Sequence, residues 1–261
     1  MAMTAGPALA AVEDQSREAR AYHLNGEFWS FLAKDSAAVL TAPLSWKGPD
    51  VLGLGLVAGA FGLVYVFDGD IQDWVQERRS EDSDEVMVVF SEMGNAVYHL
   101  ALVGGLYVVG ELAPSFSLRQ TAVLGMESLA VTSVVVLSLK CLLGRARPGT
   151  GQGPRHFEPF SFRSSYFSLP SGHAASAFAL ATAIAERSES VVLDVAVYAL
   201  AGAIALSRLH NNEHWASDVL LGSALGHVIA RKISDLNKSP EKKVALSLGV
   251  SPGGLSLRVR F

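Results

Sequence analysis

Long runs of apolar residues, separated by short polar stretches, dominate the chain from residue 51 to residue 230. Continuous apolar runs of this length are too long for strands and indicate helices. The pattern therefore predicts an all-α fold, a six-helix bundle whose helices cover residues 51–67, 96–112, 121–143, 174–185, 191–207 and 219–230.

The lengths of these runs bracket the about 20 apolar residues that a helix needs to cross a bilayer. Glu127 and Asp194 lie inside two of the runs, and an ionisable group in hydrocarbon is costly. So much uncharged length is nevertheless unusual in a soluble bundle. We therefore expect the bundle to be membrane-embedded, with a soluble helical domain as the alternative.

The two ends of the chain differ from this central part. Residues 1–50 are mixed and polar, and the small residues near the start resemble the end of a secretory signal without its apolar core. The stretches 244–250 and 255–261 alternate apolar and polar residues around Ser251-Pro252-Gly253-Gly254, a pattern that predicts a small C-terminal β-hairpin. The chain thus divides into an N-terminal segment (1–50), a helical domain (51–236) and a tail (237–261).

Composition narrows the function further. Of the 261 residues, 50% are hydrophobic and 18% charged, and the net charge is −4. The sequence has no basic stripe of the kind that nucleic-acid binding needs, so nucleic acid is not an expected partner. Cys141 is the only cysteine, which rules out an internal disulfide and a cysteine zinc cluster.

The first motif with candidate chemistry is Lys140-Cys-Leu-Leu-Gly-Arg-Ala-Arg147-Pro148. It closes a long helical run and places Lys140 and Arg147 near each other, with proline and glycine ending the helix. By itself the motif is also consistent with a basic cap that favours the helix dipole.

The second motif, Pro170-Ser171-Gly172-His173, leads directly into the fourth apolar run. Serine is a strong N-cap, and glycine leaves backbone N–H groups accessible to an anion at the helix N-terminus. His173 in the first turn is placed to give a proton to a leaving group. Taken alone, an ordinary capped helix with a surface histidine explains the same residues.

The third motif is Ser207-Arg208-Leu-His-Asn-Asn-Glu-His214-Trp-Ala-Ser-Asp218. His214 and Asp218 are four residues apart, so on a helix they share a face within hydrogen-bonding distance. A carboxylate that holds one ring nitrogen leaves the other free to attack. Arg208 supplies a forked donor for phosphoryl oxygens. A surface His–Asp pair is the plain alternative.

The order of the motifs along the bundle links them. In an up-and-down bundle, the first motif follows the end of the third helix and the second begins the fourth. The third motif spans the end of the fifth helix and the start of the sixth. All three motifs are therefore predicted to lie at one end of the bundle, which no capping explanation accounts for.

The three motifs, in this order, resemble those of the type 2 phosphatidic acid phosphatase and vanadium haloperoxidase superfamily. Their patterns are Lys-x6-Arg-Pro, Pro-Ser-Gly-His and Ser-Arg-x5-His-x3-Asp. The resemblance covers roughly residues 139–222. It implies that His214 attacks phosphorus and forms a phosphohistidine, that Asp218 orients His214, and that His173 protonates the leaving oxygen. It also implies that the phosphoryl oxygens are bound, with no metal or other cofactor, by Lys140, Arg147, Ser171, Gly172 and Arg208.

Three other interpretations compete with a phosphatase. Cys141 to Arg147 also fits Cys-x2-Gly-x2-Arg, the phosphate loop of cysteine-dependent phosphatases, but that loop needs a preceding strand and a following helix. A vanadium-dependent haloperoxidase shares the pocket, although those enzymes are much longer chains. A non-catalytic membrane protein is the third alternative, and the intact Lys140, His173, His214 and Asp218 argue against it.

The expected activity is therefore hydrolysis of phosphate monoesters or pyrophosphates. Because of the predicted membrane bundle, the expected substrates are lipid-linked; a soluble periplasmic acid phosphatase is the alternative. The aromatic loop 156–167 either grips an acyl chain or packs over the bundle. Basic residues at the bundle end opposite the motifs predict an inner-membrane protein of the bacterial cell envelope with its site facing the periplasm: Arg231, Lys232, Lys238, Lys242 and Lys243.

Overall fold

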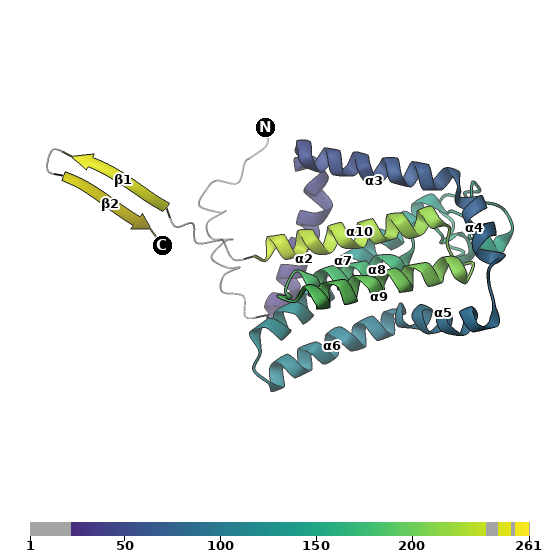
Figure 1. The fold of residues 1–261 in the computed structure, drawn as a ribbon, viewed down its shortest axis with the longest axis horizontal. Helices are drawn as coiled ribbons and strands as arrows, with labels where there is room; N and C mark the ends of the chain where they lie inside the picture. The colour runs from purple at the N-terminus through teal and green to yellow at the C-terminus, as the bar shows by residue number, and fades with distance from the viewer. Residues whose placement is uncertain (1–21, 239–244, 252–253, 261) are drawn as a thin grey trace. The chain divides into compact units, whose positions relative to one another are not determined.

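The computed structural model describes residues 22–238, 245–251 and 254–260, and these residues are mostly helical (Figure 1). The α-helices are α2 (Gly26–Thr41), α3 (Gly48–Val66), α4 (Asp68–Gln76), α5 (Glu81–Met93), α6 (Ala96–Leu112), α7 (Phe116–Leu143), α8 (Gly172–Ala185), α9 (Val191–His210) and α10 (Ala216–Leu236). Short 3-10 turns lie at Ala42–Ser45, Pro148–Thr150 and Ser164–Tyr166.

The predicted helical class is confirmed, but the predicted number of helices is not. The described residues contain nine α-helices, of which α3 and α6 to α10 correspond to the six apolar runs. The additional helices α2, α4 and α5 carry mixed polar sequences, so a search for apolar runs misses them. Two of them start at good N-caps: Asn25 Oδ1 accepts from Glu27 N at 2.9 Å, and Ser80 Oγ accepts from Ser83 N at 3.2 Å.

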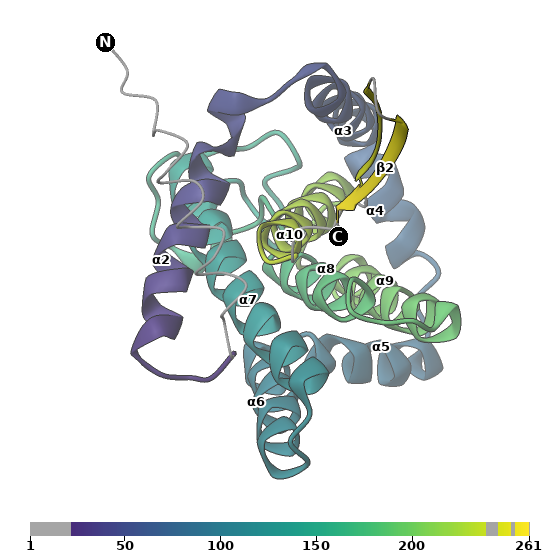
Figure 2. The ribbon, with the colours of Figure 1, turned by 90° about the vertical axis from the view of Figure 1, so that its left-hand side faces the viewer.

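Helix α8 lies at the centre of the bundle, in contact with α7, α9 and α10 (Figure 2). It can occupy this position because it is built from small residues, many of them fully buried alanines. The backbones of α8 and α10 approach closely. A Cβ added at Gly222 would lie 2.4 Å from Ser171 O, and one at Gly226 would lie 2.0 Å from Ala175 O. Glycine at both positions therefore sets how near α10 comes to the start of α8.

Three helices are long and apolar enough to cross a membrane, namely α3, α7 and α9. Helices α5 and α6 together pass the same test as a pair bent by 54°, which would make a fourth span. Helix α3 has no buried residue, and Leu52, Leu56 and Leu63 on it are exposed. The composition of these helices is that of segments in contact with lipid.

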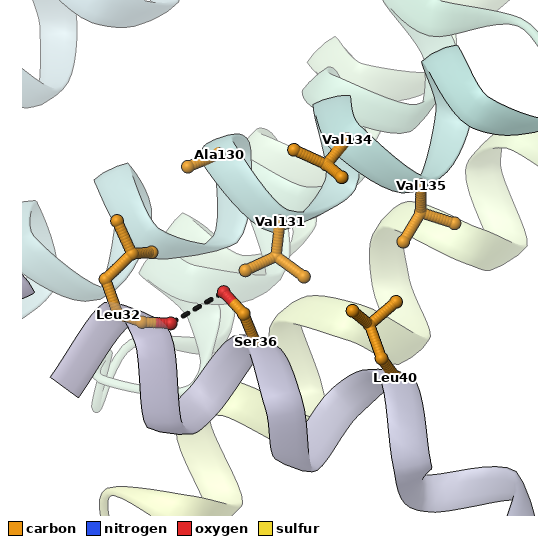
Figure 3. A pocket seen from close by; sticks show the side chains of 7 residues that line it. All are labelled: Leu32, Ser36, Leu40, Ala130, Val131, Val134 and Val135. Carbon is orange, nitrogen blue, oxygen red and sulfur yellow. Dashed lines mark hydrogen bonds between the residues drawn. The ribbon is translucent and has the colours of Figure 1, made fainter. Parts of the chain in front are cut away.

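A small apolar pocket lies between α2 and α7 (Figure 3). The Ser36 hydroxyl donates to Leu32 O at 2.6 Å, so its polar atom is satisfied within α2. No residue of the three motifs lines the pocket, whose walls are Leu32, Ser36, Leu40, Ala130, Val131, Val134 and Val135.

The C-terminal tail contains two antiparallel strands, β1 (Ala245–Ser251) and β2 (Gly254–Arg260). Ala245 lies opposite Arg260 and Ser251 lies opposite Gly254. Two sequence-based expectations fall outside the described residues: the signal-like stretch at the start of the chain, and the basic residues Lys242 and Lys243.

Candidate active site

The residues of the three motifs come together where four helix ends meet: the end of α7, the start of α8, the end of α9 and the start of α10. The backbone N–H of Ser171 donates to Asp218 O at 2.9 Å, which joins the second motif to the third. A Cβ added at Gly172 would lie 3.8 Å from Lys140 Cε, so the first motif adjoins the second. The predicted site residues therefore share one end of the bundle.

Lys140 lies in the last turn of α7 and is buried, with its ammonium donating to Phe167 O at 2.5 Å. The helix ends at Gly144, which has a φ of +58° and donates its N–H to Lys140 O at 2.9 Å. A Cβ at Gly144 would lie 1.7 Å from Glu158 O. Only glycine fits this left-handed turn, which directs Arg145 and Arg147 toward the other motifs.

Ser171 stands at the N-cap position of α8, but its hydroxyl makes no capping hydrogen bond, contrary to the sequence-based expectation. The Oγ atom is buried and has no hydrogen-bond partner in the described part of the chain. An unpaired buried hydroxyl costs about 1–3 kcal/mol, and an anion at the helix N-terminus would give this hydroxyl a partner.

His173 follows in the first turn of α8, close to the junction of α5 and α6, where a Cβ added at Gly94 would lie 2.8 Å from its Cδ2. Burial lowers the pKa of His173 to about 4, helped by the positive charge of Arg208, His99, Lys140 and Arg147. A bound phosphoryl group would add negative charge beside these cations and raise the pKa again.

His214 does not lie on a helix face with Asp218, as the spacing had suggested, because α10 begins only at Ala216. His214 Nδ1 is 3.8 Å from Asp218 Oδ2, longer than a hydrogen bond. The Asp218 carboxylate instead accepts from Arg145 Nη1 at 2.6 Å, Ser168 Oγ at 2.5 Å and Trp215 N at 3.0 Å. The predicted His–Asp hydrogen bond is therefore not formed in this structure. Catalytic hydrogen bonds are often long in a ligand-free enzyme and shorten when substrate binds.

His214 is nevertheless in the protonation state that a nucleophile needs. Burial lowers its pKa to about 3; Asp218 opposes the shift, while Lys140 and Arg147 add to it. Burial alone would raise the pKa of Asp218, but the proximity of His214, Arg145 and Ser168 outweighs it and keeps the pKa below its usual value. At neutral pH the site thus pairs a neutral imidazole with an ionised carboxylate.

Arg145 is a residue of the site that the motif spacing did not identify. It is fully buried and donates from Nη1 to Ser217 Oγ at 2.8 Å and to Asp218 Oδ1 at 2.6 Å. Its Nη2 donates to Asp68 Oδ2 at 2.7 Å. Asp68 also accepts from Ser217 N at 2.8 Å and from Ser217 Oγ at 2.5 Å. Arg145 and Asp68 therefore hold the start of α10, and with it Asp218.

Two arginines complete the cationic part of the site. The side chain of Arg208 is 9% exposed and that of Arg147 is 29% exposed, and both contact the carboxylate of Glu213. Arg208 Nη1 also donates to Ser91 Oγ on α5. Several buried polar atoms of the site lack a partner in the described residues: Ser171 Oγ, His214 Nδ1, Arg147 Nε and Arg208 Nε. His214 Nδ1 faces Asp218, whereas the buried hydroxyl of Ser171 and the buried N–H groups of the two arginines are donors that suit an anionic ligand.

The cysteine-dependent alternative lacks its structural context. Cys141 lies within α7 rather than after a strand, and Arg147 is followed by a 3-10 turn at Pro148–Thr150 rather than by a helix. Among the described residues, no group of three or more His, Cys, Asp or Glu side chains is arranged to hold a metal ion.

Comparison with known proteins agrees with this geometry. Residues 122–237 match the model of the PAP2 superfamily. A 74-residue stretch is 47% identical to the lipid A 1-phosphatase of Porphyromonas gingivalis, covering 26% of this chain and 17% of that protein. The chain thus spans less than a fifth of the length of that relative.

Two solved structures share the fold. LpxE from Aquifex aeolicus superposes with a TM-score of 0.52 at 20% identity, over 63% of this chain and 92% of LpxE. The transmembrane PAP2 type phosphatidylglycerolphosphate phosphatase from Bacillus subtilis gives a TM-score of 0.50 at 17% identity, over 83% of this chain and 97% of that one.

Proposed function

Because this chain belongs to the PAP2 superfamily through residues 122–237, we propose that it is a lipid phosphate phosphatase, which hydrolyses phosphate monoesters or pyrophosphates. One observation carries the proposal: the buried, neutral His214 lies at the same bundle end as Lys140, Arg147 and Arg208. A neutral nucleophile surrounded by cations suits attack on a phosphoryl group, whose negative charge the cations offset.

In the proposed reaction, His214 attacks phosphorus through Nε2, the ring nitrogen away from Asp218. The N–P bond forms as the bond from phosphorus to the leaving oxygen breaks, and His173 gives that oxygen its proton. Water then attacks the phosphohistidine and loses its proton to His173, the N–P bond breaks, and inorganic phosphate is released. Asp218 fixes the Nδ1–H tautomer of His214 once ligand binding closes the 3.8 Å separation.

The remaining residues bind the phosphoryl oxygens. Arg147 and Arg208 offer forked donors, Lys140 a point charge, and Ser171 and Gly172 a hydroxyl and an N–H at the start of α8. Three cations supply the charge stabilisation that a metal ion provides in other phosphatases. The proposed reaction therefore proceeds without a metal.

A lipid-linked substrate is supported by two kinds of observation. The relatives named above are a lipid A 1-phosphatase and a phosphatidylglycerolphosphate phosphatase. In addition, α7 and α9, which carry Lys140 and Arg208 near their ends, are long and apolar enough to span a membrane. A lipid held in the bilayer would present its phosphate at the level of these helix ends.

The proposed location is the inner membrane of the cell envelope, with the site facing the periplasm. Arg231 and Lys232 lie in the second half of α10, whereas Asp218 lies in its first turn. Since basic residues favour the cytoplasmic side, the position of Arg231 and Lys232 supports a site that faces the periplasm.

The test is phosphate release from a panel of lipid and soluble phosphoesters in the presence of EDTA. Wild type and Cys141→Ser should turn over equally, and His214→Ala should lose more than about a thousandfold, the range typical for removal of a nucleophile. A folded wild type that releases no phosphate, but oxidises bromide with added hydrogen peroxide when loaded with vanadate, would replace the proposal with a haloperoxidase. A preference for soluble esters would replace the lipid substrate with a soluble one.

A further inference from the structure

Glu213, the residue before the proposed nucleophile, places an acidic side chain in the cationic site. Its Oε2 accepts from Arg147 Nη1 and lies 3.8 Å from Arg208 Nη2. The side chain is 37% exposed, so it lies at the open rim of the site rather than in the core. None of the roles assigned above uses this carboxylate.

The backbone of Glu213 is held in place by the turn that ends α9. Asn212 has a φ of +57°, a left-handed conformation that asparagine tolerates and that reverses the chain after the helix. Gln72 Nε2 on α4 donates to Asn212 Oδ1 at 2.7 Å, and Glu213 N donates to Arg208 O at 3.1 Å. The backbone of Glu213 is thus fixed beside the arginines, while its partly exposed side chain is able to rotate toward solvent.

The carboxylate and a phosphoryl group need the same donors. Arginine binds both through its forked N–H groups, and Arg147 and Arg208 are the two forked cations of the proposed phosphate site. Two anions on the same pair of arginines would repel each other at close range. We propose that Glu213 is an internal competitor, which occupies the phosphoryl subsite of the free enzyme and swings out when substrate binds.

This role has a consequence for product release. Inorganic phosphate, the proposed product, must also displace Glu213 in order to stay bound, but it lacks the lipid part that adds binding energy to the substrate. Displacing Glu213 costs the same free energy for both, but only the substrate has lipid contacts that offset this cost, so Glu213 favours the release of free phosphate. The inference rests on the proposed function in one respect, since the displacing anion is taken to be a phosphoryl group.

The experiment measures binding of inorganic phosphate and of vanadate to the detergent-solubilised full chain by calorimetry. Glu213→Gln keeps the size of the side chain and removes its charge. It should lower the Kd for both anions by about fivefold, the size expected for a half-exposed ion pair. Glu213→Ala should act in the same direction, which guards against an effect peculiar to glutamine.

Glu158→Gln is the matched control. Glu158 is also an exposed glutamate paired with an arginine, accepting from Arg163 Nη2 at 2.5 Å, but this pair lies in the loop between α7 and α8 and includes no motif residue. Its removal should leave the Kd for phosphate unchanged.

Unchanged or weaker phosphate binding in both Glu213 variants, with melting temperatures equal to that of wild type, would overturn the inference and make Glu213 a residue that positions the arginines. Since binding is measured without turnover, the result is separate from the proposed function. Tighter phosphate binding in a chain that hydrolyses no phosphoester would uphold the competitor role and refute the phosphatase.

Discussion

At the scale of single residues, the two histidines of the site owe their protonation states mainly to burial. The pKa of His214 lies at about 3 and that of His173 at about 4. A lowered histidine pKa means that the neutral form persists to lower pH. Over most of the acid range His214 thus has the neutral form that the proposed attack needs, whereas His173 lacks the proton that the proposed mechanism requires it to donate.

The value of kcat/KM should therefore decrease on the alkaline side of the pH profile. With an alkyl phosphate, kcat/KM should decline as pH rises above about 4, because the protonated fraction of His173 in the free enzyme drops. It should not show an acid limb near pH 6.5, because the pKa of His214 is lowered to about 3. The measurement is a pH–rate profile from about pH 3.5 to 8, in which each limb of kcat/KM reports a group of the free enzyme.

An aryl phosphate with a good leaving group is the control for that profile. Its leaving oxygen needs no proton, so its alkaline decline should be much shallower once each profile is corrected for the second pKa of that substrate's phosphate, which is lower in the aryl ester. Identical alkaline limbs for the two substrates would show that His173 is not the general acid.

Arg145 offers a second prediction at this scale. Arg145→Gln leaves Asp68 and Asp218 buried without their cation, a change that typically costs about 3–5 kcal/mol. We expect a large fall in melting temperature together with loss of phosphate release. Arg163→Gln is the control, since that arginine is 65% exposed and an exposed ion pair contributes little to stability. Equal stability of the two variants would contradict the role given to Arg145.

At the scale of helices, the contact between α8 and α10 depends on the absence of side chains. Gly226→Ala places a Cβ 2.0 Å from Ala175 O, a backbone atom that cannot move without shifting α8. We expect a loss of about 1–3 kcal/mol, as for other overpacked cores, read as a lower melting temperature in detergent. Gly202→Ala on α9, where no atom lies within 4 Å of the new Cβ, should be neutral or slightly stabilising. Similar melting temperatures for both would refute this packing argument.

The apolar helices were largely predictable from the sequence, while the polar helices α2, α4 and α5 and the connections between helices were not. The apolar runs located α3 and α6 to α10, and alternation of direction brought Lys140, Ser171 and Arg208 to one end. The pairing of Arg145 with Asp68 could not be foreseen, because it joins residues 77 positions apart and no local pattern encodes it.

The spacing of His214 and Asp218 gave a wrong prediction because of the local sequence at the start of α10. Asp218 occupies the third position of α10 and accepts from Trp215 N, the reciprocal half of a capping box. Since a tryptophan rather than a serine or threonine precedes the helix, this helix start is hard to recognise in the sequence. The helix begins after His214, which breaks the assumption that residues four apart share a helix face.

At the scale of the whole molecule, the exposed apolar surface of α3 indicates where the protein is located. A 19-residue apolar helix with none of its residues buried is unstable in water. We therefore predict that the protein stays in the membrane fraction after washing with alkaline carbonate and is released by detergent. A matched variant with three exposed leucines of α3 changed to lysine, at Leu52, Leu56 and Leu63, should insert poorly. Recovery of wild type in the wash supernatant would contradict a membrane location.

The buried Arg145 pair also bears on the order in which the protein matures during synthesis. Asp68 is synthesised 77 residues before Arg145, whereas Asp218 follows 73 residues after Arg145. As the chain leaves the ribosome, Arg145 can therefore be neutralised by Asp68 long before α10 emerges. The proposed hydrolysis must wait for α10, the last of the described helices, because it requires Asp218 in that helix and His214 just before it. A nascent chain would thus carry a paired Arg145 while its proposed site is still incomplete.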